Sequence, residues 1–176
     1  GDRSFSSNPK IVSKIGDLCI KYSKMNSIGT VIKHIPGHGL SKADSHYYTP
    51  SVNKSFNYLK NRDFKAFKSK NSLFAMTAHV IFSKIDPDNT VTHSKKLIKI
   101  IRNQIKFKNL IISDDLSMKS LKFTIIENTK KAFDAGCNLV LHCNGNLKEM
   151  TLIAKNSPKV NSFILKKTSE FYKNLS

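Results

Sequence analysis

A short stretch between residues 33 and 46 concentrates the side chains that are best suited to chemistry. It runs from Lys33 to Gly39 with the letters KHIPGHG, is followed by Asp44 and His46, and holds three of the six histidines. Two glycines and a proline predict a loop with special backbone demands. A histidine two residues from an aspartate can form a dyad, in which the carboxylate fixes the imidazole tautomer and raises its basicity. The stretch therefore predicts a catalytic or ligand-binding loop.

Two other interpretations of this loop stay open at this stage. Three histidines suggest a metal site, but their spacing matches no common zinc pattern and the glycines argue against a helix that would present them. A plain solvated loop is the other alternative.

The elements that must position these side chains alternate between short apolar runs and helical patterns. The runs at 28–32, 73–81, 110–112 and 137–142 predict strands. Asn8-Pro9 and Ser94 have the residue types that begin helices, and Gly136 has the type that ends one. We expect helices at 9–22, 56–67, 94–105, 121–135, 147–156 and 160–174, the first with an apolar face made of Ile11, Ile15, Leu18 and Tyr22.

Strands that alternate with helices of this length predict βα units around a parallel sheet. Each predicted strand has polar residues at or near its end: Lys33-His34, His79, Ser113-Asp114 and His142-Cys143-Asn144. In an α/β barrel the active site lies at those C-terminal strand ends, so the candidate chemistry converges on one face. Four such units are about half of a (β/α)8 barrel. The sequence has no internal repeat or linker that would mark a second domain.

The composition is typical of a globular domain, with 39% hydrophobic and 24% charged residues and no apolar run long enough for a membrane span. The net charge of +18 invites a nucleic-acid interpretation, but only Arg3, Arg62 and Arg102 are arginines. Lysines spread along the chain support non-specific attraction only, so we expect no specific nucleic-acid partner. Cys19 and Cys137 lie in apolar stretches and are expected to be buried, and free thiols favour the cytoplasm.

Several motifs together resemble one enzyme family over essentially the whole chain. Lys33 to Gly39 with Asp44-Ser45-His46 is similar to the K-H-F-P-G-H-G…D-S-H signature of bacterial β-N-acetylhexosaminidases of glycoside hydrolase family 3, the cell-wall recycling type. Further matches, in the family's order, are Arg3-Ser4-Phe5, Ala78-His79-Val80, Ser113 to Met118 (SDDLSM) and Asp134 to Cys137. Ile35 replaces the family's usual Phe, which is a change between apolar side chains.

The resemblance implies a (β/α)8 TIM-type barrel, of which residues 1–176 would be one catalytic-domain fragment, roughly the C-terminal half to two-thirds. It implies a retaining β-N-acetylglucosaminidase with Asp114 as the nucleophile and His46 as the acid/base, oriented by Asp44. Arg3, Lys33 and His34 would bind the sugar. The implied partners are GlcNAc-containing peptidoglycan fragments (muropeptides) in the cytoplasm, with no membrane, cofactor or metal, and the full-length protein would be a monomer.

Each assignment has a simpler alternative. Asp114 at a strand end could cap a helix, and chemistry alone does not separate it from the adjacent Asp115. His79 could be a core histidine, and His38, His93 and His142 are expected to be structural. Two rival activities also remain, because related enzymes with a His acid/base can act as β-N-acetylglucosaminide phosphorylases, and a degenerate barrel could persist as a non-catalytic sugar-binding remnant.

Overall fold

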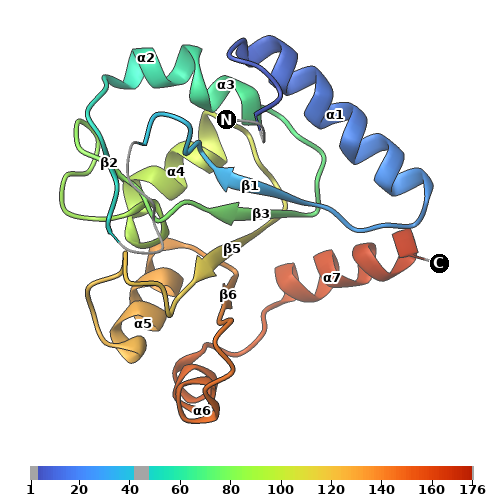
Figure 1. The fold of residues 1–176 in the computed structure, drawn as a ribbon. Helices are drawn as coiled ribbons and strands as arrows, with labels where there is room; N and C mark the ends of the chain where they lie inside the picture. Colours follow the sequence, from blue (N-terminus) through green and yellow to red (C-terminus); the bar gives the residue numbers. More distant parts are fainter. Residues whose placement is uncertain (1–3, 42–47, 176) are drawn as a thin grey trace.

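The computed structural model describes residues 4–41 and 48–175. Its centre is a four-stranded sheet in which all neighbours are parallel (Figure 1). The strand order is β1 (Val31–Ile35), β3 (Phe74–Thr77), β5 (Leu110–Asp115), β6 (Leu139–Leu141). Because the strands are parallel, their C-terminal ends lie along the same edge of the sheet. Two further strands that the sequence did not predict, β2 (Ser51–Val52) and β4 (Ile81–Phe82), pair with each other in parallel.

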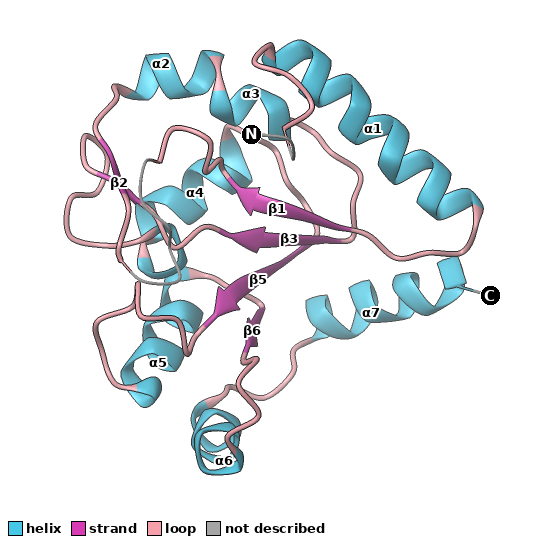
Figure 2. Ribbon diagram, in the orientation of Figure 1, coloured by secondary structure: helices cyan, strands magenta, loops and turns pink. Residues whose placement is uncertain are grey.

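Helices surround the sheet and connect its strands (Figure 2). They are α1 (Pro9–Met25), α2 (Phe56–Asn61), α3 (Asp63–Phe67), α4 (Lys95–Asn103), α5 (Ile125–Ala135), α6 (Leu147–Asn156) and α7 (Ser162–Leu175), with a 3₁₀ turn η1 (Val91–His93). The predicted caps are confirmed: the Asn8 side chain accepts from the Lys10 amide, and Ser94 accepts from the Leu97 amide. Gly136 ends α5 with a φ of 114°, a left-handed conformation that glycine adopts without steric cost.

Three predicted boundaries were wrong for identifiable reasons. The first strand begins at Val31 and continues through the polar Lys33 and His34, because the pairing with β3 extends to Ile35. The run 73–81 is a strand only as far as Thr77, and its last residue belongs to β4. The helix expected at 121–135 begins at Ile125, since Thr124 and Glu127 form a capping box there.

The main core lies between the sheet and the helices α4 and α5. Leu97 and Ile101 from α4, Ile111 from β5 and Ala132 from α5 are fully buried in one cluster. Burying each larger aliphatic side chain contributes about 2 kcal/mol, so this packing fixes β5 against its helices. The strand that carries Asp114 is therefore held along its length by apolar contacts.

The apolar face predicted for the first helix is largely exposed. Ile11, Leu18 and Tyr22 retain 47%, 42% and 57% of their accessible surface, and Cys19 is exposed, contrary to the sequence expectation. Cys137 is buried as expected. Among the described residues, β1 and β6 each pair on one side only. The sheet is thus an open part of a barrel, with an uncovered apolar helix face beside the outer strand β1.

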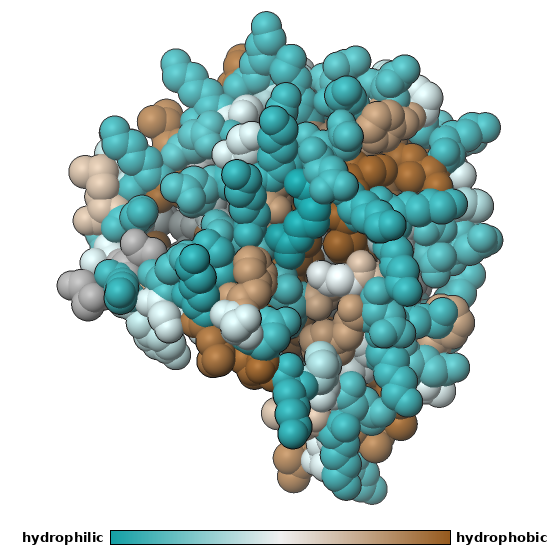
Figure 3. Space-filling view, turned by 180° about the vertical axis from the view of Figure 1, so that it is seen from behind, coloured by the Kyte–Doolittle hydropathy of each residue, from teal (hydrophilic) through white to brown (hydrophobic). Residues whose placement is uncertain are grey.

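The remaining surface is mostly polar. The face turned away from Figure 1 is dominated by hydrophilic side chains, with apolar patches between them (Figure 3). No helix in the described part of the chain combines the length and the hydropathy that crossing a membrane requires.

Candidate active site

The C-terminal edge of the sheet brings together two of the predicted site residues. His34, near the end of β1, and Asp114, near the end of β5, face each other with 3.5 Å between the imidazole Nε2 and the carboxylate Oδ2. The two side chains are 29% and 14% exposed, so both are reachable from solvent while largely packed. His38 follows in the loop, and its ring centre lies 5.7 Å from that of His34. The convergence on one face predicted from the strand ends is confirmed for these residues.

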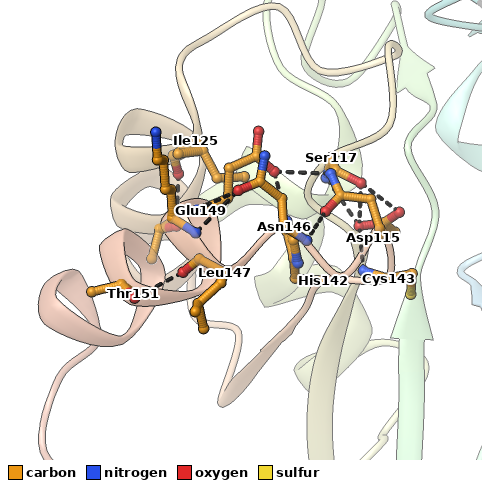
Figure 4. Close-up of polar contacts among 12 residues, drawn as sticks. Asp115, Ser117, Ile125, His142, Cys143, Asn146, Leu147, Glu149 and Thr151 are labelled. Atoms are coloured by element: carbon orange, nitrogen blue, oxygen red, sulfur yellow. Dashed lines mark hydrogen bonds and ion pairs between the residues drawn. The ribbon is translucent and has the colours of Figure 1, made fainter.

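The structure separates the roles of the two adjacent aspartates. The Asp115 carboxylate accepts hydrogen bonds from the Ser117 amide (3.0 Å), the Ser117 hydroxyl (2.7 and 2.8 Å) and the Cys143 amide (3.1 Å) (Figure 4). Among donors from the described residues, Asp114 accepts one hydrogen bond, from the Asp115 amide to Oδ1 at 2.9 Å. Its Oδ2 points toward His34. Asp115 is therefore committed to holding the loops together, and Asp114 presents the carboxylate oxygen that is available for chemistry.

The electrostatics of His34 favour a neutral imidazole. Burial lowers its pKa to about 4, although the Asp114 carboxylate acts in the opposite direction, and Lys33 and His38 add to the lowering. A neutral imidazole can donate one hydrogen bond and accept another. Beside a carboxylate, such a group suits the recognition of a sugar hydroxyl better than the storage of a proton.

His79 contacts the main chain of Asp115 and is fully buried. Its Nε2 is 3.0 Å from the main-chain carbonyl oxygen of Asp115, and its Nδ1 is 2.8 Å from the Thr92 hydroxyl. The interpretation of His79 as a satisfied interior histidine agrees with these contacts. Sequence reasoning did not find Thr92, because this partner comes from the separate turn η1.

A second polar pair that sequence reasoning did not find lies at the end of β6. His142 Nε2 is 2.7 Å from Glu149 Oε2 on α6, and the Asn144 side chain donates to the same oxygen at 2.9 Å. Figure 4 places this pair beside the Cys143 amide that binds Asp115. These contacts connect α6 to the loop after β6, which agrees with the structural role expected for His142.

A cavity of about 550 Å³ opens beside His34. Its walls include the polar side chains Lys33, His38, Arg62 and Asp63, together with the segment 4–7 that follows the predicted Arg3. Lys33 and His34 therefore line the same cavity as residues 4–7. These residues directly follow Arg3, which the sequence predicted to bind the sugar.

Three predicted site residues, Arg3, Asp44 and His46, lie outside the described residues. Within residues 4–41 and 48–175, no group of three or more His, Cys, Asp or Glu side chains is arranged to hold a metal ion.

A parallel sheet flanked by helices, with acidic and imidazole groups gathered at its C-terminal strand ends, is the arrangement of part of a (β/α)8 barrel. The model of the glycosyl hydrolase family 3 N-terminal domain matches residues 1–167. The chain belongs to glycosyl hydrolase family 3, and the predicted family and fold class are confirmed.

Individual relatives agree with this assignment. A beta-hexosaminidase of Actinobacillus pleuropneumoniae is 40% identical over 150 residues, which are 82% of this chain and 44% of that protein. The crystal structure of native NagZ from Neisseria gonorrhoeae is 29% identical with a TM-score of 0.85, and the match covers 97% of this chain and 51% of that one. The beta-N-acetylglucosaminidase from Thermotoga maritima is 28% identical with a TM-score of 0.78, covering 98% and 40%. The chain thus spans about half the length of the relatives it matches.

Proposed function

We propose that this chain supplies the nucleophile half of the active site of a retaining β-N-acetylglucosaminidase. The observation that carries the proposal is the contrast between the neighbouring aspartates, in which Asp115 is occupied by three donor groups and Asp114 directs Oδ2 outward beside His34. Asp114 would attack the anomeric carbon, the leaving-group oxygen would depart with a proton, and water would then hydrolyse the glycosyl-enzyme.

The other roles follow the family motifs. His46 would donate the proton to the leaving group and later remove one from water, with Asp44 orienting its imidazole. Lys33 and His34 line the cavity, and His34 also lies 3.5 Å from Asp114. Together with Arg3, these two residues would hold the hydroxyl groups of the sugar. His34, neutral because burial lowers its pKa, can take part in such neutral hydrogen bonds.

The proposed substrate is a non-reducing terminal N-acetylglucosamine on a peptidoglycan fragment. Relatives named beta-hexosaminidase and beta-N-acetylglucosaminidase support the sugar, and the cell-wall source comes from the resemblance of the motifs. We place the reaction in the cytoplasm, catalysed by a monomer of the full-length protein without a cofactor.

We also propose that residues 1–176 are a fragment of a single catalytic domain rather than a domain complete in itself. In the described residues β1 and β6 each pair on one side only, and the apolar face of α1 is exposed. Further βα units would pair with these strand edges and cover the face of α1, which supports the proposal. Size-exclusion chromatography and thermal melting of the 176-residue chain test it. A sharply melting monomer would contradict the proposal.

The decisive experiment measures the release of nitrophenol from an aryl β-N-acetylglucosaminide by the complete gene product and by its Asp114→Ala variant. We expect turnover by the parent and none by the variant. Added azide should restore turnover of the variant and yield the α-glycosyl azide, because azide attacks C1 from the face that Asp114 vacates while the aryl oxide leaves. A well-folded parent without turnover would refute the enzymatic proposal.

A further inference from the structure

A chain of hydrogen bonds runs through the interior below the candidate nucleophile. The hydroxyl oxygens of Thr77 and Thr92 are 2.8 Å apart, and Thr92 Oγ1 is also 2.8 Å from His79 Nδ1. His79 Nε2 then contacts the Asp115 carbonyl oxygen at 3.0 Å. All three side chains are fully buried, so water does not compete for these contacts.

The donor and acceptor of each hydrogen bond in this series follow from the last acceptor, the Asp115 carbonyl oxygen. A carbonyl oxygen only accepts, so His79 must carry its proton on Nε2 and donate it to Asp115. Burial lowers the pKa of His79, which keeps the ring neutral and leaves Nδ1 as an acceptor. Thr92 therefore donates to Nδ1, and Thr77 donates to Thr92.

This chain fixes the main chain next to the nucleophile. The Asp115 residue is held at its carbonyl by His79 and at its carboxylate by Ser117 and Cys143. Its amide in turn donates to Asp114 Oδ1. With Asp115 fixed at these points, the Asp114 carboxylate has one oxygen anchored and the other turned toward His34.

The geometry points to His79 as a positioning residue, which holds the Asp115 main chain through a defined Nε2–H tautomer and thereby sets the orientation of the Asp114 nucleophile. The inference rests on the proposed function for its catalytic consequence, whereas the tautomer and the contact do not depend on it. His79 touches neither the reacting atoms nor the sugar in this role. His79 follows β3, and its hydrogen bond holds the end of the neighbouring strand β5.

Two substitutions of His79 test its two ring-nitrogen contacts separately. His79→Gln keeps an amide donor near the Nε2 position, and His79→Asn keeps an acceptor near Nδ1 but loses the donor to Asp115. In the complete gene product, we expect His79→Asn to lower kcat about 100-fold, the order of loss that a misplaced reacting group causes. His79→Gln should stay within about 5-fold of the parent, and KM should change less than about 2-fold in both.

Thr92→Val serves as a further variant, since it removes the hydroxyl that holds Nδ1 and leaves His79 in place. It should fall between the two His79 variants in kcat. Rates are normalised to the fraction of active enzyme, obtained from the burst of nitrophenol in the first turnover. A purely structural role would reduce that fraction and the melting temperature without changing kcat per active site, and this result would overturn the inference.

Histidine-selective ¹⁵N NMR of the parent tests the contact independently of activity. We expect His79 to be a neutral Nε2–H tautomer at pH 7, with a proton that exchanges slowly with solvent. An Nδ1–H tautomer, or equal loss of kcat in the Gln and Asn variants, would overturn the inference. An inactive parent with the expected tautomer would instead refute the proposed function and confirm the contact.

Discussion

Replacing each of the two adjacent aspartates in turn should give opposite outcomes for stability and activity. Asp115→Ala removes the acceptor of three donor groups, namely the Ser117 amide, the Ser117 hydroxyl and the Cys143 amide. At about 1 kcal/mol for each partly exposed hydrogen bond, the free energy of unfolding should fall by about 3 kcal/mol. At roughly 2–4 °C per kcal/mol, the melting temperature should fall by about 6–12 °C.

Asp114→Asn is the matched variant, because it changes one atom and can keep Oδ1 as the acceptor of the Asp115 amide. Its melting temperature should stay within about 2 °C of the parent, as expected where no buried partner is lost. Hydrolysis of the aryl glycoside should fall by at least about 10⁴-fold, since a carboxamide is not a nucleophile for C1.

Differential scanning calorimetry and the aryl glycoside assay, applied to both variants of the complete gene product, measure the two quantities. The assignment of roles would be refuted if Asp115→Ala melted like the parent, or if Asp114→Asn retained activity. It would also be refuted if azide rescued Asp115→Ala but not Asp114→Ala, because Asp115 would then be the nucleophile.

Three other perturbations have defined outcomes. Gly37→Ala should lower activity and stability, because Gly37 has a φ of 143° and a Cβ there would lie 2.7 Å from Asp63 Cβ. Gly39→Ala should have little effect, because apart from its chain neighbours no atom of the described residues lies within 4 Å of a Cβ added there. Activity and melting temperature of both variants check this. Lowering the pH from 7 to 5 should lower the free energy of unfolding by about 2 kcal/mol through His93 alone. Burial lowers the pKa of His93 in the folded protein to about 4, so the stability present above pH 6.5 is lost on acidification as the unfolded state takes up a proton that the folded state does not. Urea denaturation of the parent and of His93→Asn at both pH values measures this, and an equal pH dependence in the variant would contradict it. Added phosphate should leave the sugar product free in the aryl glycoside assay, and formation of a sugar 1-phosphate would favour the phosphorylase alternative.

The local features of the fold could be predicted because they depend on neighbouring residues. Residue types within one or two turns predicted the cap at Ser94, the end of α5 at Gly136 and the whole extent of α6. The face of α1 could not be predicted, because periodicity identifies an apolar face but not what covers it. The strands β2 and β4 also escaped prediction, since two residues carry no measurable alternation.

In the candidate site too, local features could be predicted and contacts between distant residues could not. The motifs located Asp114 and His34, but the distinction between Asp114 and Asp115 depends on donors from Ser117, two residues away, and from Cys143, 28 residues further along the chain. The contact between His79 and Thr92 likewise joins two loops that only the folded sheet brings together. Spacing in the sequence cannot reveal such pairs, because the distance between strand ends is set by strand order.

The order of the strands explains why these few contacts suffice to hold the Asp114 carboxylate. β3 and β5 are direct neighbours, in which Phe74 pairs with Leu110 and Met76 pairs with Ile112. The residues that follow these pairs in the two strands therefore lie at the same level of the sheet. His79 follows β3 and therefore reaches the main chain of Asp115 at the end of β5. Because β5 is also packed against α4 and α5 in one buried apolar cluster, this end of the strand cannot shift without breaking either the core or the hydrogen bonds. The Asp114 carboxylate is thus oriented by the protein alone, which is the preorganisation that its proposed role as a nucleophile would require.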